Sequence, residues 1–96
     1  MTHYVLSSAA EVDLTEIMEF IAEDSPRAAL SILGEIRSAL RRLAELPDIG
    51  HRRAGLPDDV RLWPVRSYLI AYRPSSDPIL ILRVMSGFRD VERLLD

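Results

Sequence analysis

The sequence predicts an α+β protein in which an N-terminal helix hairpin packs on an antiparallel sheet, with the element order β-α-α-β-β-β. Two long segments before residue 47 carry apolar residues at three- and four-residue spacing, which is typical of amphipathic helices. Three shorter segments after residue 59 are rich in β-branched and aromatic residues and are separated by turn-forming residues, as strands are. Because a chain of 96 residues suits one hydrophobic core, we expect a single domain over residues 1–96.

The chain opens with a predicted strand and a predicted helix. Residues 2–6 are β-branched and aromatic in part, which favours a strand. Ser8 and Glu11 fit a capping box, in which the two side chains bond to free backbone N–H groups of the first helical turn. The apolar positions that follow share one face of a helix and are Ala10, Leu14, Ile17, Met18 and Ile21. The pattern predicts an amphipathic helix with an acidic outer face.

A second helix is predicted to begin at Ser25 and Pro26. Serine caps a helix well, and proline is tolerated at the first helical position because its missing N–H has no partner there. The apolar face comprises Ala29, Ile32, Leu33, Ile36, Leu40, Leu43 and Ala44. Pro47 and Gly50 end the helix. Gly34 inside it marks either a close approach to the first helix or a tolerated defect, and we favour the defect.

A loop over residues 48–59 leads to three predicted strands, at 60–65, 68–73 and 79–85. Pro64 cannot donate a hydrogen bond to a neighbouring strand, which favours an edge strand or a bulge. The last strand is almost continuously apolar, as expected of a central strand covered on both faces. We expect the three strands to form an antiparallel meander, followed by one or two helical turns over residues 89–95.

Composition excludes several classes of protein. No apolar run reaches the length of about 18 residues that a membrane helix needs, and the first residues do not form a signal peptide, so we expect a cytoplasmic protein. The absence of cysteine excludes disulfides, a thiolate metal site and a cysteine nucleophile. We expect no cofactor.

Charge is distributed unevenly along the chain. All 12 basic residues are arginines and the first is Arg27, whereas six of the acidic residues precede it. The arginine fork binds carboxylates and phosphates well, which would favour an acidic protein partner or nucleic acid. The simpler interpretation is that a GC-rich gene encodes arginine in place of lysine and that these side chains are solvated, and we favour it. The runs of adjacent arginines are too short, and too mixed with acidic residues, to predict direct DNA binding by this chain alone.

Six segments together resemble the RelE/ParE toxin superfamily, and its ParE or plasmid-stabilisation branch in particular. They are residues 6–14, 25–29, 46–50, 60–65, 68–73 and 81–90, so the resemblance covers nearly the whole chain. Each segment alone is weak, but the ordered set is specific. The resemblance implies a toxin of a type II toxin–antitoxin system, bound and neutralised in a hetero-oligomer by a small ParD-like antitoxin that wraps the helix hairpin and the sheet. ParE members are described as DNA gyrase inhibitors, and RelE members as ribosome-dependent mRNA endoribonucleases.

The choice between these two activities depends on a few positions of the sheet. A ribonuclease must stabilise an anionic phosphate and move protons, which needs basic groups and a general acid or base on one sheet face. Here Arg61 is present, but Trp63 and Leu69 stand at positions where the resemblance to RelE would place basic residues, and Ser86 stands where many relatives carry histidine. We therefore predict no catalytic residue and no enzyme activity, and keep the ribonuclease as the alternative.

Arg83 is the most informative single residue, because a lone charge on an apolar strand is costly unless it is paired or faces a cleft. It contacts either the antitoxin or target, or an internal partner such as Asp90 or a helix carboxylate; the residues do not decide between them. The candidates for contacts with the antitoxin or target are Arg61, Trp63, Tyr68, Arg73, Arg83 and Arg89. For the arginines at strand ends, simple solvation is the competing interpretation. For Trp63 and for Tyr68 and Tyr72, which share a strand face, the competing interpretation is core packing.

The two histidines receive no functional role. His51 lies in a loop beside two arginines without a nearby carboxylate in sequence, so a solvated side chain is expected. His3 lies far from it in sequence, and no acidic residues stand at ligand spacing from either, so no metal site is predicted. The hypothesis is a toxin that binds a protein target. A third interpretation is a non-toxic relative retained as an antitoxin-binding partner.

Overall fold

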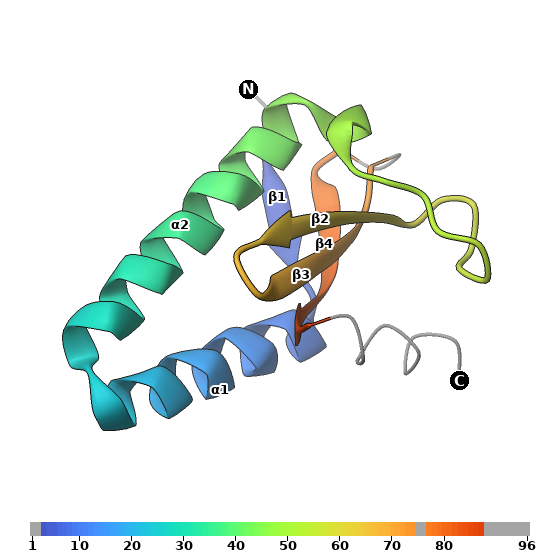
Figure 1. Ribbon diagram of the computed structural model, residues 1–96. Coiled ribbons are helices and arrows are strands. Elements are labelled where there is room, and N and C mark those ends of the chain that lie inside the picture. Colours follow the sequence, from blue (N-terminus) through green and yellow to red (C-terminus); the bar gives the residue numbers. More distant parts are fainter. Residues whose placement is uncertain (1–2, 75–76, 88–96) are drawn as a thin grey trace.

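The computed structural model describes residues 3–74 and 77–87 and contains two helices on a four-stranded sheet (Figure 1). The elements are β1 (Tyr4–Leu6), α1 (Ser8–Asp24), α2 (Pro26–Glu45), a short 3-10 helix (Pro47–Ile49), β2 (Arg61–Val65), β3 (Tyr68–Arg73) and β4 (Ile79–Ser86). The predicted α+β class and element order are confirmed. The expected helical turns at 89–95 lie outside the described residues.

The sheet has the strand order β1-β4-β3-β2. β2, β3 and β4 form the expected antiparallel meander, with β4 inside the sheet and β2 at its edge. β1, however, pairs with β4 in parallel, so that Tyr4 lies opposite Ile79 and the sheet is mixed. The expectation of a purely antiparallel sheet is wrong in this one pair, because the long connection between the strands allows the chain to return to the same end of the sheet.

The helices follow each other with Ser25 as the one residue between them, and they spread from that corner as the two arms of a V (Figure 1). The Ser25 hydroxyl accepts a hydrogen bond from the Ala28 N–H at 3.1 Å, and Pro26 occupies the first helical position, as predicted. Gly34 has open space around the position of an added Cβ, so it marks no close helix approach. Within the described chain no helix has the length and apolar character needed to span a bilayer.

The larger core cluster lies between the helices and one face of the sheet. α2 contributes Ile36, Leu40, Leu43 and Ala44, and the sheet contributes Ile70, Tyr72, Ile79, Ile81 and Val84. Tyr72 is fully buried there, and Tyr68 packs at the margin of the same cluster. The expectation that the two tyrosines share a strand face is therefore confirmed, and that face is the one under the helices. Core packing is confirmed for Tyr72.

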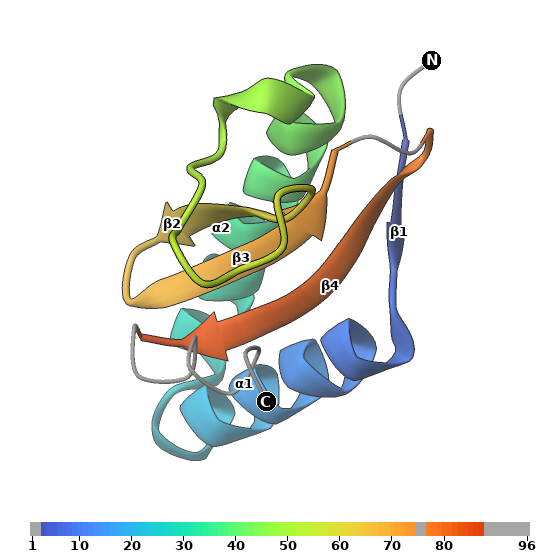
Figure 2. The ribbon, with the colours of Figure 1, turned by 90° about the vertical axis from the view of Figure 1, so that its right-hand side faces the viewer.

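A smaller cluster covers the opposite face of the sheet. Its residues are Leu56, Val60, Leu62, Leu69, Ala71 and Met85. The loop of residues 50–60 crosses over β2 and β3 on this face, while α2 lies behind the sheet (Figure 2). Both faces of β4 and β3 are consequently apolar, which explains why these strands read as near-continuous hydrophobic runs.

Candidate functional site

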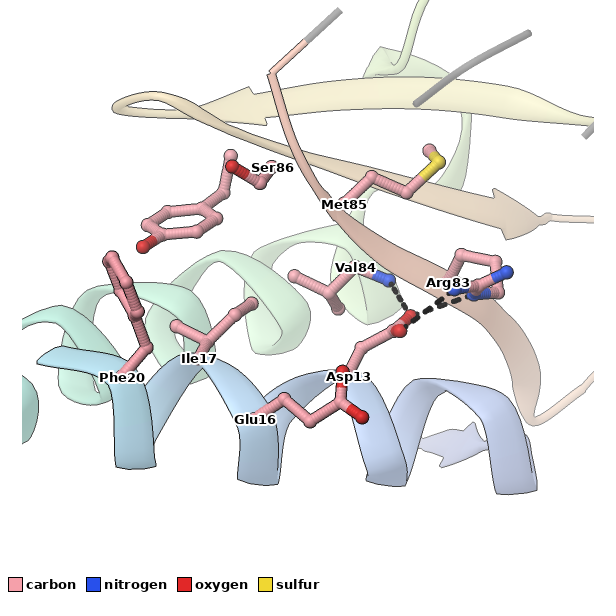
Figure 3. Close-up of a pocket in the computed structure, with 9 residues that line it drawn as sticks. Asp13, Glu16, Ile17, Phe20, Arg83, Val84, Met85 and Ser86 are labelled. Atoms are coloured by element: carbon pink, nitrogen blue, oxygen red, sulfur yellow. Dashed lines mark hydrogen bonds and ion pairs between the residues drawn. The ribbon is translucent and has the colours of Figure 1, made fainter. Parts of the chain in front are cut away.

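The site of interest lies between α1 and the second half of β4, and its central residue is Asp13 (Figure 3). The Asp13 carboxylate accepts hydrogen bonds from Arg83 Nε at 2.8 Å, from the second guanidinium nitrogen of Arg83 at 2.9 Å and from the Val84 N–H at 2.9 Å. Asp13 is only 8% exposed. A buried carboxylate is tolerated when its oxygens are hydrogen-bonded and its charge is paired, and both conditions are met here.

This pair gives Arg83 an internal partner. It is a helix carboxylate, one of the two kinds of internal partner that the sequence left open; a contact of Arg83 with the antitoxin or target stays a prediction. The expected acidic outer face of the first helix is wrong for Asp13, which points inward at the sheet. The side chain of Arg83 is still 38% exposed, so its outer part also lines the surface.

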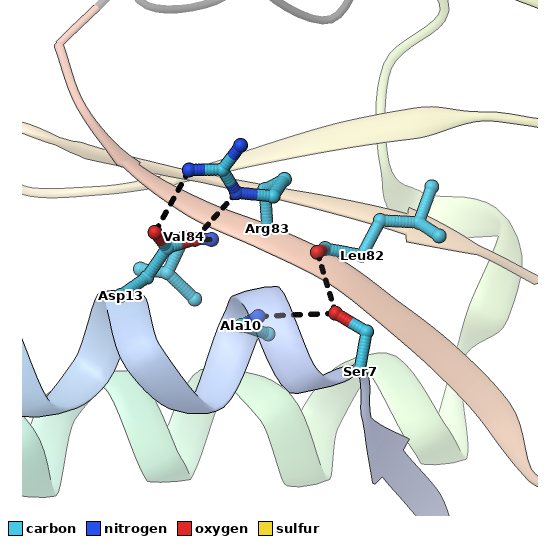
Figure 4. Close-up of polar contacts among 6 residues, drawn as sticks. All are labelled: Ser7, Ala10, Asp13, Leu82, Arg83 and Val84. Carbon is cyan, nitrogen blue, oxygen red and sulfur yellow. Dashed lines mark hydrogen bonds and ion pairs between the residues drawn. The ribbon is translucent and has the colours of Figure 1, made fainter.

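Ser7 makes a second contact between the start of α1 and β4 (Figure 4). Its hydroxyl accepts a hydrogen bond from the Ala10 N–H at 3.0 Å and donates one to the Leu82 carbonyl at 2.7 Å. Ser7 is therefore the N-cap, and the predicted cap at Ser8 is wrong by one residue. The sheet explains the difference, because the Ser7 hydroxyl both caps the helix and donates a hydrogen bond to β4. Ser8 lies inside the helix and makes neither contact.

Together, Ser7 and Asp13 extend the hydrogen bonding of β4 beyond the end of β1. The last pair of the two strands joins Leu6 to Ile81. The register of β4 against β3 then shifts, so that Tyr72 faces Ile81 but Ala71 faces Arg83, which leaves Leu82 as the extra residue of a bulge. The side chains of Ser7 and Asp13 bond to the Leu82 carbonyl and the Val84 N–H in this irregular stretch, where buried backbone groups need partners.

A half-open pocket of about 330 Å³ lies next to the pair. It is lined by Asp13, Glu16, Ile17, Phe20, Tyr68, Arg83, Val84, Met85 and Ser86. Figure 3 shows the α1 side chains Ile17 and Phe20 pointing toward the end of β4. Phe20 is 72% exposed, an unusual state for a phenylalanine in a position where it could pack. The pocket thus has an apolar wall and an acidic rim at Glu16.

The structure separates the six candidate contact residues. Arg83 and Tyr68 line the pocket between α1 and β4. Arg61 and Trp63 lie on the edge strand β2, and Arg73 lies at the end of β3. Arg89 lies outside the described residues. The candidates therefore do not form one surface.

The other three described candidates, two on β2 and one at the end of β3, each have partners in the described part of the chain. Arg61 donates to the carbonyls of Gly50, at 3.0 Å, and of Asp48, at 3.3 Å. Trp63 stacks on His51 with ring centroids 6.1 Å apart. Arg73 Nε lies 3.0 Å from a carboxylate oxygen of Asp59. His51, expected to be solvated, is exposed and uses its ring in this stack.

The positions that argued against ribonuclease chemistry lie on different faces. Trp63 packs against the core cluster under the helices, whereas Leu69, only 3% exposed, belongs to the cluster on the opposite face. The assumption that they belong to one catalytic face is wrong, since Trp63 pairs with Ile70 and Leu69 with Pro64. Ser86 is exposed at the pocket. Within residues 3–74 and 77–87, no three acidic or histidine side chains gather as a metal site would require.

Tyr72 joins the sheet to the segment after α2. Its hydroxyl donates to the Pro47 carbonyl at 2.6 Å and accepts from the Gly50 N–H at 2.9 Å. Burial raises the pKa of the Tyr72 phenol above its ordinary value of about 10, and the Gly50 N–H and the charge of Arg61 offset this increase in part. The Tyr72 hydroxyl therefore fastens β3 to the segment after α2 through two hydrogen bonds.

The family model described as "ParE toxin of type II toxin-antitoxin system, parDE" matches residues 4–91. The chain belongs to this ParE toxin family. One ParE relative, Toxin ParE3 of Caulobacter vibrioides, is 28% identical over 76 residues, which are 78% of this chain and 76% of the relative. A solved structure described as the chromosomal ParDE TA system from P. aeruginosa has the same fold with a TM-score of 0.75; at 21% identity it covers 92% of this chain and 98% of that one. The resemblance to the ParE branch is confirmed.

The sequence interpretation missed Asp13, Glu16 and Phe20 as site residues. One signal for Asp13 was present: positions 10, 13, 14 and 17 share a helix face, so a carboxylate at 13 interrupts an apolar stripe. No such signal marks Glu16 or Phe20, because a surface glutamate and a phenylalanine near a helix end are common in many folds. Their position in a pocket depends on β4, which is more than 60 residues away in sequence.

Proposed function

We propose that this protein is the toxin of a type II toxin–antitoxin system and that a ParD-like antitoxin neutralises it by direct binding in a hetero-oligomer. The observation that carries the proposal is the family match over residues 4–91, which includes every helix and strand of the described residues. The solved P. aeruginosa structure, described as a ParDE TA system, supports an antitoxin as partner.

We propose further that the toxin inhibits growth by binding a protein target, DNA gyrase, rather than by catalysis, and that it does so in the cytoplasm. The contacts of the basic side chains support this. Arg83 is hydrogen-bonded to Asp13, Arg61 is hydrogen-bonded to two backbone carbonyls, and Arg73 forms an ion pair with Asp59, so each is already oriented by the fold. A phosphate-cleaving site would need several such groups converging on one face together with an acid or base.

The first test is expression of the gene with and without the small open reading frame beside it. Growth arrest that the neighbouring product relieves is the expected result, together with a stable complex of the two purified proteins. Growth arrest that no neighbouring product suppresses would contradict the toxin–antitoxin assignment. Normal growth with antitoxin binding retained would instead identify a non-toxic relative.

The second test addresses the target. Purified toxin is added to DNA gyrase and relaxed plasmid, and supercoiling is followed on agarose gels, with toxin premixed with antitoxin as the control. We expect loss of supercoiling that the antitoxin prevents, and induction of the SOS response in cells. Primer extension on transcripts after induction provides the opposing outcome, because new codon-linked cleavage ends would replace the gyrase proposal with a ribosome-dependent mRNA endoribonuclease.

A further inference from the structure

The pocket between α1 and β4 is lined on one side by charged side chains, including the Asp13–Arg83 pair, and on the other side by exposed apolar side chains. Both oxygens of Asp13 accept hydrogen bonds from Arg83 or from the Val84 N–H, so the Asp13 carboxylate is already neutralised. Glu16, the next acidic side chain on the rim, is exposed and forms no ion pair or hydrogen bond within the described residues. The charge that a ligand would meet in this pocket is therefore negative.

The surroundings of Glu16 strengthen this negative field. α1 contains Glu11, Glu19, Glu23 and Asp24 besides the two acidic pocket residues, and it contains no arginine, lysine or histidine. Like charges on one helix raise the local potential and favour a cationic ligand group at its surface. An acidic segment of a partner would be repelled at this place.

The apolar side of the pocket indicates that the ligand also carries an apolar group next to its cationic group. Phe20 exposes 72% of its surface beside Ile17, Tyr68 and Met85, and a pocket of about 330 Å³ is at the small end of ligand sites. That volume suits a large apolar side chain. Burying Phe20 under such a side chain would remove apolar surface from water, and aromatic residues at pocket walls are the common anchors of protein interfaces.

We propose that this pocket binds a segment of the antitoxin that inserts one large apolar side chain against Phe20 and places an arginine or lysine beside Glu16. The proposal rests on the proposed function, because it presupposes an antitoxin as the partner. The arginine-rich sequence suggests basic groups on the toxin and acidic groups on the partner, whereas here the acidic group belongs to the toxin and the basic group to the antitoxin. The arginine nearest to the pocket, Arg83, serves to hold the Asp13 wall in place, and the toxin contributes the acidic group to the new ion pair.

The experiment compares two pairs of surface variants of the full chain. Phe20→Ala removes the apolar wall, and Leu30→Ala removes a similarly exposed apolar side chain from α2 outside the pocket. Glu16→Lys reverses the rim charge, and Glu19→Lys makes the same change on α1 outside the pocket. All four positions are exposed, so circular dichroism should show unchanged folding. The probe is the purified antitoxin encoded beside the gene, and the dissociation constant is measured by titration calorimetry.

We expect Phe20→Ala to weaken antitoxin binding about tenfold and Glu16→Lys about threefold, with the latter effect decreasing at high salt. Leu30→Ala and Glu19→Lys should bind as the parent does. Equal binding by all four variants, or equal losses in test and control variants, would overturn the pocket assignment while leaving the toxin–antitoxin function intact. Unchanged antitoxin binding with lost toxicity would also overturn it and would assign the pocket to the target. A parent chain that does not bind the antitoxin would refute both proposals.

Discussion

Among the single residues, Asp13 joins α1 to β4 through three hydrogen bonds. Removing one partner of a buried charge pair leaves the other without compensation, and this effect exceeds the net contribution of the pair itself. The exposed outer part of Arg83 limits that penalty, because water can reach its guanidinium. Most of the expected loss therefore comes from the Val84 N–H and from the buried end of the ion pair.

We expect Asp13→Ala to lower the free energy of unfolding by about 3 kcal/mol, measured by urea denaturation. Arg83→Met should lower it less, because Asp13 keeps its bond to the Val84 N–H. Glu19→Ala on the exposed face of α1 is the control and should change stability by less than about 0.5 kcal/mol. A loss below about 1 kcal/mol in Asp13→Ala would show that the pair contributes little.

Two glycines offer a matched test of packing at residue scale. A Cβ on Gly50 would overlap the Tyr72 hydroxyl, whereas a Cβ on Gly34 would meet nothing within 4 Å. We expect Gly50→Ala to destabilise the protein by about 2 kcal/mol through this overlap and the lost hydrogen bond. Gly34→Ala, inside an exposed part of α2, should stabilise it by up to about 1 kcal/mol. Thermal unfolding of both variants checks the opposite signs, and a stabilising Gly50→Ala would contradict the packing.

The contact between β3 and the 3-10 helix belongs to the scale of elements, and Tyr72 makes it sensitive to alkaline pH. The folded protein holds the phenolic proton at a pH where the unfolded chain has already released it, since the pKa is raised only in the fold. Its contribution is complete below about pH 10 and is lost as the pH rises through the higher folded pKa. Denaturation curves between about pH 9 and pH 11 should therefore show a steeper decline for the parent than for Tyr72→Phe. Parallel curves would contradict this origin.

The outer edge of β2 is protected in two ways. Leu62 exchanges two backbone hydrogen bonds with His51, at 2.7 and 2.8 Å, so its N–H and carbonyl point away from β3. Pro64 is two residues further along and faces the same side, but it has no N–H to offer. Edge strands invite pairing with other chains unless such devices prevent it.

We expect Pro64→Thr to restore an outward N–H at this edge and to increase self-association. Size-exclusion chromatography with light scattering, at matched concentrations, should show a larger dimer fraction than in the parent. Pro57→Thr in the exposed loop is the control, because that residue lies outside the strands. A monomer at every concentration would show that the His51 contact alone protects the edge.

The sequence predicted the elements more accurately than their assembly. β3 begins and ends at the predicted residues, and the start of α2 follows from the local chemistry of serine and proline. These features depend on neighbours along the chain. The N-cap at Ser7, the inward Asp13 and the pocket at Phe20 depend on β4, which lies more than 60 residues away, and no periodic pattern encodes such a distance.

At the scale of the whole molecule, the parallel pair of β1 and β4 connects the two ends of the described chain. Every other described element lies between them in sequence, and β4 pairs with β1 on one side and with β3 on the other. We expect a chain ending at residue 78 to lack a cooperative unfolding transition, since α1, β1 and β3 would all lose their contacts with β4. Calorimetry on this fragment and on the full chain checks this, and a cooperative transition in the fragment would contradict the central role of β4.

The same pairing affects when the chain can fold during translation. Translation delivers β1 well before β4, so the first strand waits without its partner while roughly 70 residues are added. The sheet cannot be completed strand by strand as the chain leaves the ribosome, because β1 needs β4 as its neighbour. Long-range pairing of this kind is also slow compared with helix formation. The complete sheet, and with it the pocket between α1 and β4, therefore forms only after β4 has been synthesised.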